Sequence, residues 1–199
     1  MLHMLGPLLA AVLLAPSDLP ALGKAPVFRV TDQDGRPFAS ASLSGKVWVA
    51  DFIFTTCKDV CPGMTRVMRQ AQRRLGHSDE LAFASLSVDP VRDTPVRLKS
   101  FALQHGADLG NWSFLTTGNE PAMVKLARAF KIHAGIAADN PYSAHAGHGQ
   151  HAHHAIKPPV THGRHFVLVD RKGEIRGFYR PDDDGLDRLV ADTRVLLGE

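Results

Sequence analysis

The chain has 199 residues, of which 44% are hydrophobic and 22% are charged, a length and balance that suit one domain with a full hydrophobic core. Its formal net charge is +3, but the lysines and arginines are scattered and form no basic stripe with interleaved aromatic residues. This distribution argues against a nucleic-acid-binding protein.

Residues 1–23 are predicted to be a signal peptide or an N-terminal anchor. Leu5 to Ala15 form an apolar run that is too short to span a bilayer but suits the core of a secretory signal. The small residues in Ala21-Leu22-Gly23 fit a cleavage site. His3 stands before the run without any Lys or Arg, so an uncleaved anchor is the alternative. We therefore expect an exported, periplasmic protein, either released or held at the inner membrane.

The next segments have strand and helix patterns. Residues 27–38 are predicted to form two strands joined by a turn at Asp34-Gly35. Val47 to Phe54 form a short apolar run rich in β-branched and aromatic residues, which predicts a buried strand. Apolar residues then recur at helical spacing and predict a helix over residues 63–75.

The junction between this strand and helix holds the only two cysteines of the chain, Cys57 and Cys61, with Pro62 directly after them. Proline suits the first turn of a helix, and the N–H groups and partial positive charge of a helix N-terminus favour a thiolate. If the turn begins at Thr56 or Cys57, both sulfurs lie on one face. The pair then suits disulfide exchange or the binding of a soft metal ion. A purely structural disulfide is disfavoured because it would close a tiny loop.

The remaining elements continue the alternation of strands and helices. The pattern predicts strands over residues 81–88 and 112–116, helices over 95–106 and 119–130, a hairpin over 165–179 and a last helix over 186–197. βαβ units favour a parallel core, and a terminal hairpin adds antiparallel strands. A cysteine motif that opens the first core helix is the thioredoxin arrangement, although the C-x-x-x-C spacing here is one residue longer than that of the oxidoreductases. We therefore expect an α/β, thioredoxin-like fold: a central mixed sheet flanked by helices, with a C-terminal β-hairpin and helix.

Residues 134–159 differ in composition from the rest of the chain. They are rich in Gly, Ala, His and Pro and have no hydrophobic period, so they are predicted to form a long flexible loop. The loop contains a cluster of histidines: His145, His148, His151, His153 and His154. This cluster is either a solvated low-complexity segment or a weak, exposed metal collector, because imidazoles bind Cu(II), Ni(II) and Zn(II).

A copper site needs more than two thiolates, and imidazole is a suitable third ligand. His162 lies just before the hairpin, and in a thioredoxin-like fold this loop packs beside the helix that begins at the cysteines. His165 is the rival ligand, and His162 could instead be a surface residue of the loop. Asp89 is a candidate for orienting a metal ligand, or it is only a turn residue before Pro90.

Several motifs resemble those of the Sco/SenC copper-chaperone family. They are Thr56 to Pro62 (TCKDVCP), Ser87 to Pro90 followed by Asp93-Thr94-Pro95, Asn111 to Leu115 (NWSFL), and a histidine shortly before an apolar strand. The resemblance spans roughly residues 25–197 and implies a thioredoxin-like domain over residues 24–199. It also implies copper, Cu(I) or Cu(II), bound by Cys57, Cys61 and His162. Near the histidine the chain departs from the family pattern, with Thr161 in place of an acidic residue and with Arg164 and His165 in place of apolar ones.

The resemblance implies a metallochaperone that delivers copper to, or prepares, the dinuclear copper site of cytochrome c oxidase. Its partners would be the copper-site subunit of that oxidase and other copper donors or thiol reductants, close to a membrane. The alternative is an enzyme, a thiol-disulfide reductase acting on cysteines of the oxidase or of other exported proteins. His162 separates the two, because a reductase needs no third ligand. A peroxidase of the peroxiredoxin type is disfavoured, because Phe54 stands where its threonine is needed.

Overall fold

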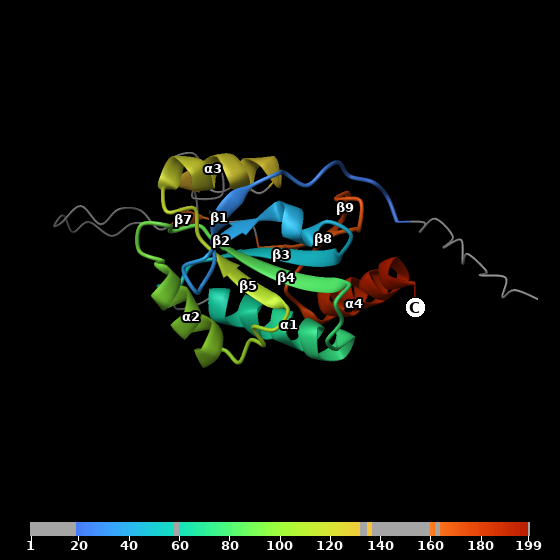
Figure 1. Cartoon of the computed structure of the whole chain (residues 1–199). Helices are drawn as coiled ribbons and strands as arrows, with labels where there is room; N and C mark the ends of the chain where they lie inside the picture. Colours follow the sequence, from blue (N-terminus) through green and yellow to red (C-terminus); the bar gives the residue numbers. More distant parts are fainter. Residues whose placement is uncertain (1–18, 58–59, 132–134, 137–159, 162–163, 199) are drawn as a thin grey trace, which may run out of the picture.

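A computed structural model of the chain describes residues 19–57, 60–131, 135–136, 160–161 and 164–198. Its centre is a five-stranded sheet in the order β5-β4-β3-β8-β9 (Figure 1). These strands are β3 (Val47–Ile53), β4 (Leu81–Ser87), β5 (Trp112–Leu115), β8 (Phe166–Val169) and β9 (Ile175–Tyr179). β3, β4 and β5 run parallel, whereas β8 is antiparallel to β3 and β9 is antiparallel to β8. The predicted mixed sheet and C-terminal hairpin are thus confirmed.

Within the residues that the structure describes, four α-helices cover the two faces of the sheet: α1 (Val60–Leu75), α2 (Pro95–Gln104), α3 (Glu120–Ala129) and α4 (Asp183–Leu197). In Figure 1, α3 lies above the sheet and α1, α2 and α4 lie below it. Side chains of β3 alternate between the faces: Val49 and Ile53 pack with α1, α2 and α4, whereas Ala50 and Phe52 pack with α3. Every residue of β3 and β4 is buried as a result.

Side-chain caps mark the residues at which α2 and α4 begin. Thr94 caps α2 as predicted, because its hydroxyl accepts a hydrogen bond from the Arg97 N–H. α4 begins at Asp183, three residues before the predicted start, because the Asp182 carboxylate accepts a 2.8 Å hydrogen bond from the Gly185 N–H. α1 likewise begins at Val60 rather than at residue 63, which places Cys61 in its first turn.

Two small antiparallel pairs flank the main sheet. β1 (Arg29–Thr31) and β2 (Pro37–Ala39) form the predicted N-terminal hairpin, followed by a short 3-10 helix, η1 (Ser40–Leu43). β6 (Gly135–Ile136) pairs with β7 (Val160–Thr161), and this pairing was not expected from the sequence. The predicted loop over residues 134–159 is therefore shortened at its start by a paired strand. The five clustered histidines and His162 lie outside the described residues.

The segment before β1 is paired to the C-terminal hairpin. The Leu22 N–H donates to the Ile175 carbonyl at 2.8 Å, and the Ile175 N–H donates back to the Gly23 carbonyl at 2.7 Å. The Arg176 guanidinium donates to the Leu19 carbonyl at 2.7 Å, and Lys24 forms a 2.7 Å ion pair with Glu174. The predicted boundary between residues 23 and 24 thus falls inside a segment that contacts β9.

A chain that begins at Lys24 is expected to be less stable than one that begins at Leu19. It lacks the three hydrogen bonds made by Leu19, Leu22 and Gly23, each of which contributes about 0.5–1.5 kcal/mol, so the loss is about 1.5–4.5 kcal/mol. Urea denaturation of the two chains measures the difference. Equal unfolding midpoints would show that the pairing adds no stability.

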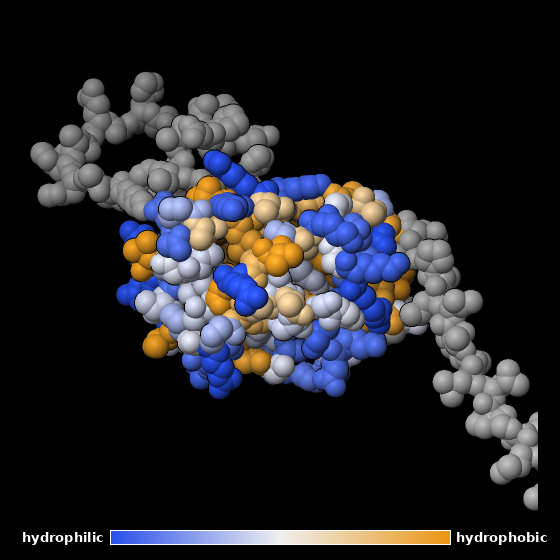
Figure 2. Space-filling model, turned by 45° about the horizontal axis from the view of Figure 1, so that its top comes forward, coloured by the Kyte–Doolittle hydropathy of each residue, from blue (hydrophilic) through white to orange (hydrophobic). Residues whose placement is uncertain are grey.

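The outer surface gives little further indication of function. Figure 2 shows hydrophobic and hydrophilic residues mixed over the face that carries α3. Among the described residues, none of the helices is both long and apolar enough to span a bilayer.

Candidate metal centre

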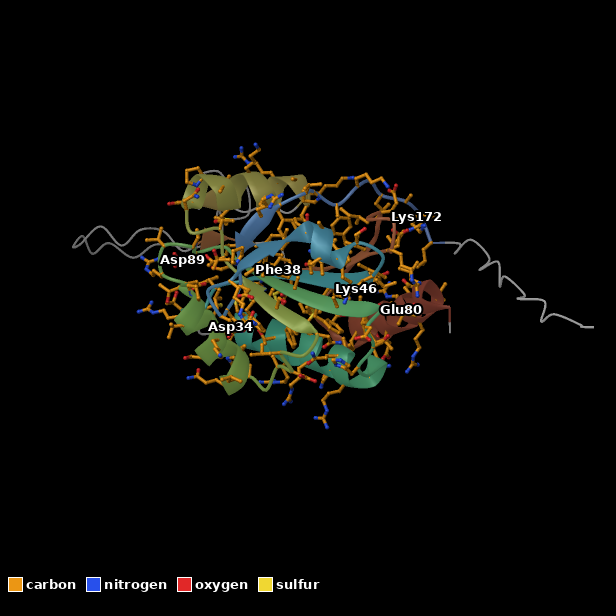
Figure 3. The ribbon with its side chains drawn as sticks, viewed as in Figure 1. Asp34, Phe38, Lys46, Glu80, Asp89 and Lys172 are labelled. Carbon is orange, nitrogen blue, oxygen red and sulfur yellow. The ribbon has the colours of Figure 1, made fainter. Side chains whose placement is uncertain are left out.

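The cysteines lie at one end of the sheet, where β3 gives way to α1. Asp89, which follows β4, marks this end in Figure 3, while Lys46, Glu80 and Lys172 mark the opposite end. In Figure 1 the start of α1, the loop after β4 and the β6–β7 pair gather at the end that Asp89 marks. The carboxyl ends of β3 and β4, both parallel, therefore meet at the cysteines.

The local backbone brings the two cysteines together. The Cys57 N–H donates to the Phe54 carbonyl at 3.2 Å, which turns the chain sharply after β3. The Cys61 N–H, in the first turn of α1, donates to Cys57 Sγ at 3.2 Å. Both cysteines are present as thiols. The predicted position at a strand-to-helix junction thus holds, and an N–H donor at a helix start stabilises negative charge on Cys57 Sγ.

The two thiols have different surroundings. Cys57 is partly exposed, whereas Cys61 is fully buried in the core cluster beneath α1. Burial is the largest cause that raises the pKa of the Cys61 thiol, and its hydrogen bond with the Cys57 side chain and the negative charge of Asp51 raise that pKa further. Cys57 is therefore the more accessible of the two sulfurs.

The buried carboxylate of Asp93 connects the loop after β4 to the residues that precede Cys57. Asp93 is fully buried and accepts hydrogen bonds from the Thr55 N–H at 3.1 Å, the Thr55 hydroxyl at 2.5 Å and the Ser87 hydroxyl at 2.6 Å. Burial raises the pKa of Asp93, and these hydrogen bonds oppose the rise. The contacts join the loop after β4 to the turn that carries Cys57.

Asp89, the other acidic residue of this loop, has a shaping role in the structure. Its carboxylate accepts a 2.8 Å hydrogen bond from Arg92, and its carbonyl accepts one from the Asp93 N–H at 2.9 Å. These contacts agree with the turn interpretation of Asp89.

The rival ligand His165 is exposed and directly precedes β8. Among the residues that the structure describes, no three His, Cys, Asp or Glu side chains form a group suited to a metal ion. The structure therefore does not bring His165 together with Cys57 and Cys61. The two thiols themselves fit a soft metal such as Cu(I), because sulfur is its preferred donor.

Two polar residues of this region escaped the sequence reasoning. The motif that contains Asp93 does not reveal its hydrogen bond with Thr55, because the two residues are 38 positions apart in the sequence. Asp51 is a lone carboxylate inside the otherwise apolar strand β3, and the sequence prediction assigned it no role. That break in the apolar pattern was the available signal.

Comparisons with known proteins agree with this geometry. The family model SCO1/SenC matches residues 19–198. A SCO1/SenC family lipoprotein from Bacillus anthracis is 30% identical, with a TM-score of 0.72 over 87% of this chain and 95% of that one. BsSco, described as a member of the Sco family of cytochrome c oxidase assembly proteins, is 27% identical, with a TM-score of 0.69 over 90% and 96%.

Two curated relatives extend the comparison. A putative copper-binding protein of Stutzerimonas stutzeri is 27% identical over 86% of this chain and 78% of its own length. A SCO1 protein homolog of Bacillus subtilis is 40% identical over 106 residues, and the match spans only about half of that relative, 55%. The family model covers residues 19–198, and the match with the Bacillus anthracis structure covers 87% of this chain. This chain therefore belongs to the SCO1/SenC family.

Proposed function

We propose that this chain binds copper and serves the assembly of the dinuclear copper site of cytochrome c oxidase. The observation that carries the proposal is the pair of thiols at the start of α1, joined by the Cys61 N–H bond to Cys57 Sγ. Soft sulfur donors at this spacing suit Cu(I). The copper-binding relative and the description of BsSco as an oxidase assembly protein support the same function.

We take Cys57, Cys61 and His162 as the copper ligands. β8 is antiparallel to β3 and pairs Val167 with Ala50, so the chain that enters β8 comes from the end of the sheet where β3 leads to the cysteines. β7 ends at Thr161, directly before His162. The described neighbours of His162 thus support its place beside the two sulfurs.

The different exposure of the sulfurs suggests an order of transfer. Copper is the cargo, and a thiolate of the acceptor can reach Cys57 at the surface before it reaches the buried Cys61. Ligand exchange would therefore begin at Cys57 and end at Cys61. Since the thiols lose protons when they bind metal, copper affinity falls as the pH is lowered.

The acceptor we propose is the copper-site subunit of the oxidase, with other copper donors or thiol reductants as further partners. An exported, periplasmic location close to the inner membrane fits this role. The apolar run in residues 5–15 supports it, as does the description of the Bacillus anthracis relative as a lipoprotein.

A thiol-disulfide reductase is the second candidate function. One accessible sulfur beside one buried sulfur also suits a dithiol in which Cys57 attacks a disulfide and Cys61 resolves the mixed disulfide. The two functions differ in their need for His162, and the reductase does not require copper.

Titration of the reduced chain with copper, beside an insulin-reduction assay, tests the proposal. We expect one tight copper per chain, plus weaker binding by the five clustered histidines. Deletion of residues 144–155 should remove only the weak binding, because that segment has no hydrophobic period and no apolar anchor. Loss of the tight copper in the deletion variant would place those histidines in the primary site. Insulin reduction without any tight copper would favour the reductase.

A further inference from the structure

Charge is unevenly distributed among the helices. α1 and α2, which lie on the same face of the sheet (Figure 1), contain six lysines and arginines and no aspartate or glutamate. α4 instead contains four aspartates, and α3 begins with Glu120. The two basic helices approach each other, because a Cβ atom at Gly106, just after α2, would lie 3.0 Å from Nη1 of Arg69 on α1. Like charges on adjacent helices repel, so packing alone does not account for this grouping.

The outward side of α2 also carries exposed apolar residues. Val96 and Leu103 are seven positions apart, which places them on one side of the helix, and they are 75% and 59% exposed. Val91, in the loop that leads to α2, is 67% exposed. In the described part of the chain, five large hydrophobic residues are exposed, and three of them lie on this short segment. Exposed apolar residues that gather in this way indicate a binding surface.

Three basic residues accompany these apolar side chains, namely Arg92, Arg97 and Lys99. Arg92 forms a 2.8 Å ion pair with Asp89, and Lys99 forms one of the same length with Asp34. Arg97 is exposed and forms no ion pair with any residue that the structure describes, while its guanidinium donates a 3.3 Å hydrogen bond to the Arg92 carbonyl. Two carboxylates thus face three cations, and the segment keeps a net positive charge.

This segment is joined to the candidate metal centre. Asp93, which lies between Val91 and Val96 in the sequence, accepts hydrogen bonds from the N–H and the hydroxyl of Thr55. Thr55 stands two residues before Cys57, the more accessible sulfur. A protein that covers Val91 and Val96 would therefore border the turn that carries Cys57.

We propose that an acidic protein, the one that exchanges copper with Cys57, docks on the α2 surface, which consists of Val91, Arg92, Val96, Arg97, Lys99 and Leu103. The inference rests on the proposed function and names the surface that the acceptor binds. Apolar side chains with arginines around them have the composition of a protein interface, and the excess of positive charge attracts carboxylates. The α2 surface contains no aromatic residue, which lipid headgroups and single-stranded nucleic acids favour. A protein is therefore the better fit.

Binding of the copper-free copper-site domain of the oxidase subunit to the reduced chain tests the docking without metal. Arg97→Glu should weaken this binding about 10-fold at low salt and less at high salt, because the reversed charge repels an acidic partner and salt screens the repulsion. Glutamate at this position completes a capping box with Thr94, so α2 should stay folded. Lys125→Glu, at an exposed site on α3, makes the same change of charge on the other face of the sheet. Equal affinities in these two variants would overturn the proposal.

A second pair of variants tests the apolar part of the α2 surface. Val96→Ser should weaken binding about 5-fold at low and at high salt alike, because an apolar contact is not screened. Val27→Ser is its control, since Val27 is 92% exposed and lies before β1. Equal affinities in the two serine variants would contradict the apolar contact. Vesicles of phosphatidylglycerol test the lipid alternative: vesicle binding that Arg97→Glu abolishes, with binding of the domain unchanged, would assign the surface to a membrane instead.

Copper titration of the Arg97→Glu chain separates the docking from the proposed function. This variant keeps Cys57, Cys61 and His162, so it should bind copper as the wild-type chain does, yet transfer copper to the domain more slowly. If the wild-type chain binds no copper tightly, the proposed function fails, while the metal-free assay still decides whether the α2 surface docks this domain. If the wild-type chain binds copper but not the domain, the docking is wrong and the copper site stands.

Discussion

Replacing either Cys57 or Cys61 by serine is expected to abolish tight copper binding and thiol-disulfide exchange together, whereas His162→Ala should separate the two. Both activities need both sulfurs, which are held side by side at the start of α1. A site without the imidazole keeps two soft donors, so Cu(I) can still bind while Cu(II) binds poorly. We expect copper affinity to fall about 10-fold or more, since loss of even an outer partner of a ligand has an effect of that size.

Competition titrations of each variant with both copper oxidation states, beside its rate with a small disulfide, measure this separation. His165→Ala is the matched control, because that side chain is an exposed histidine three positions away. Unchanged Cu(II) affinity in His162→Ala, with a large loss in His165→Ala, would move the ligand to His165. Unchanged affinity in both would favour the reductase over the chaperone.

Stability should decrease with rising pH because of Asp51. Its pKa is about 7 in the folded chain against an ordinary value of 3.8, so the folded state binds the extra proton between these values. The stability linked to that proton is complete below pH 3.8 and is lost as the pH rises through 7. The full change is about 4 kcal/mol, of which about 2–3 kcal/mol falls between pH 5 and pH 8.

Urea denaturation of the wild-type and Asp51→Asn chains at pH 5 and pH 8 measures this contribution. The asparagine variant has no titrating group at this position, so it should lack that part of the pH dependence. Asp93 also has a raised pKa and acts in the same direction, but its effect is common to both chains and cancels in the comparison. Parallel stability profiles in the two chains would mean that Asp51 does not titrate in the folded state.

Much of the architecture could be predicted from the sequence because long elements carry strong periodic patterns. The apolar run of β3 and the helical spacing of α1 determined the βαβ core, and Thr94 with Pro95 marked the start of α2. Short elements lack such a pattern. β6 and β7 have two residues each, and their pairing depends on a contact between distant segments that no local signal reveals.

The same limit applies to the candidate site. The cysteines were evident from their spacing, but the tie between Asp93 and Thr55 depends on how two loops meet. The relation of Asp51 to Cys61 depends on which face of the sheet α1 covers, which the strand alone does not specify. Asp89 could be placed in its turn only when its contact with Arg92 was known.

Residues 22–25 pair with β9 and with the turn before it. This pairing fixes the end of the sheet at which the N-terminal segment enters the domain. The chain enters at the end of the sheet marked by Lys172, and Asp89 marks the other end (Figure 3), where β3 leads to the cysteines. The seven residues of β3 separate these poles by roughly 23 Å at about 3.3 Å per residue. If residues 1–18 are held in a bilayer, the thiols lie at the pole of the sheet opposite the point where the chain leaves that bilayer. The chain could then reach an acceptor whose copper site stands clear of the membrane surface.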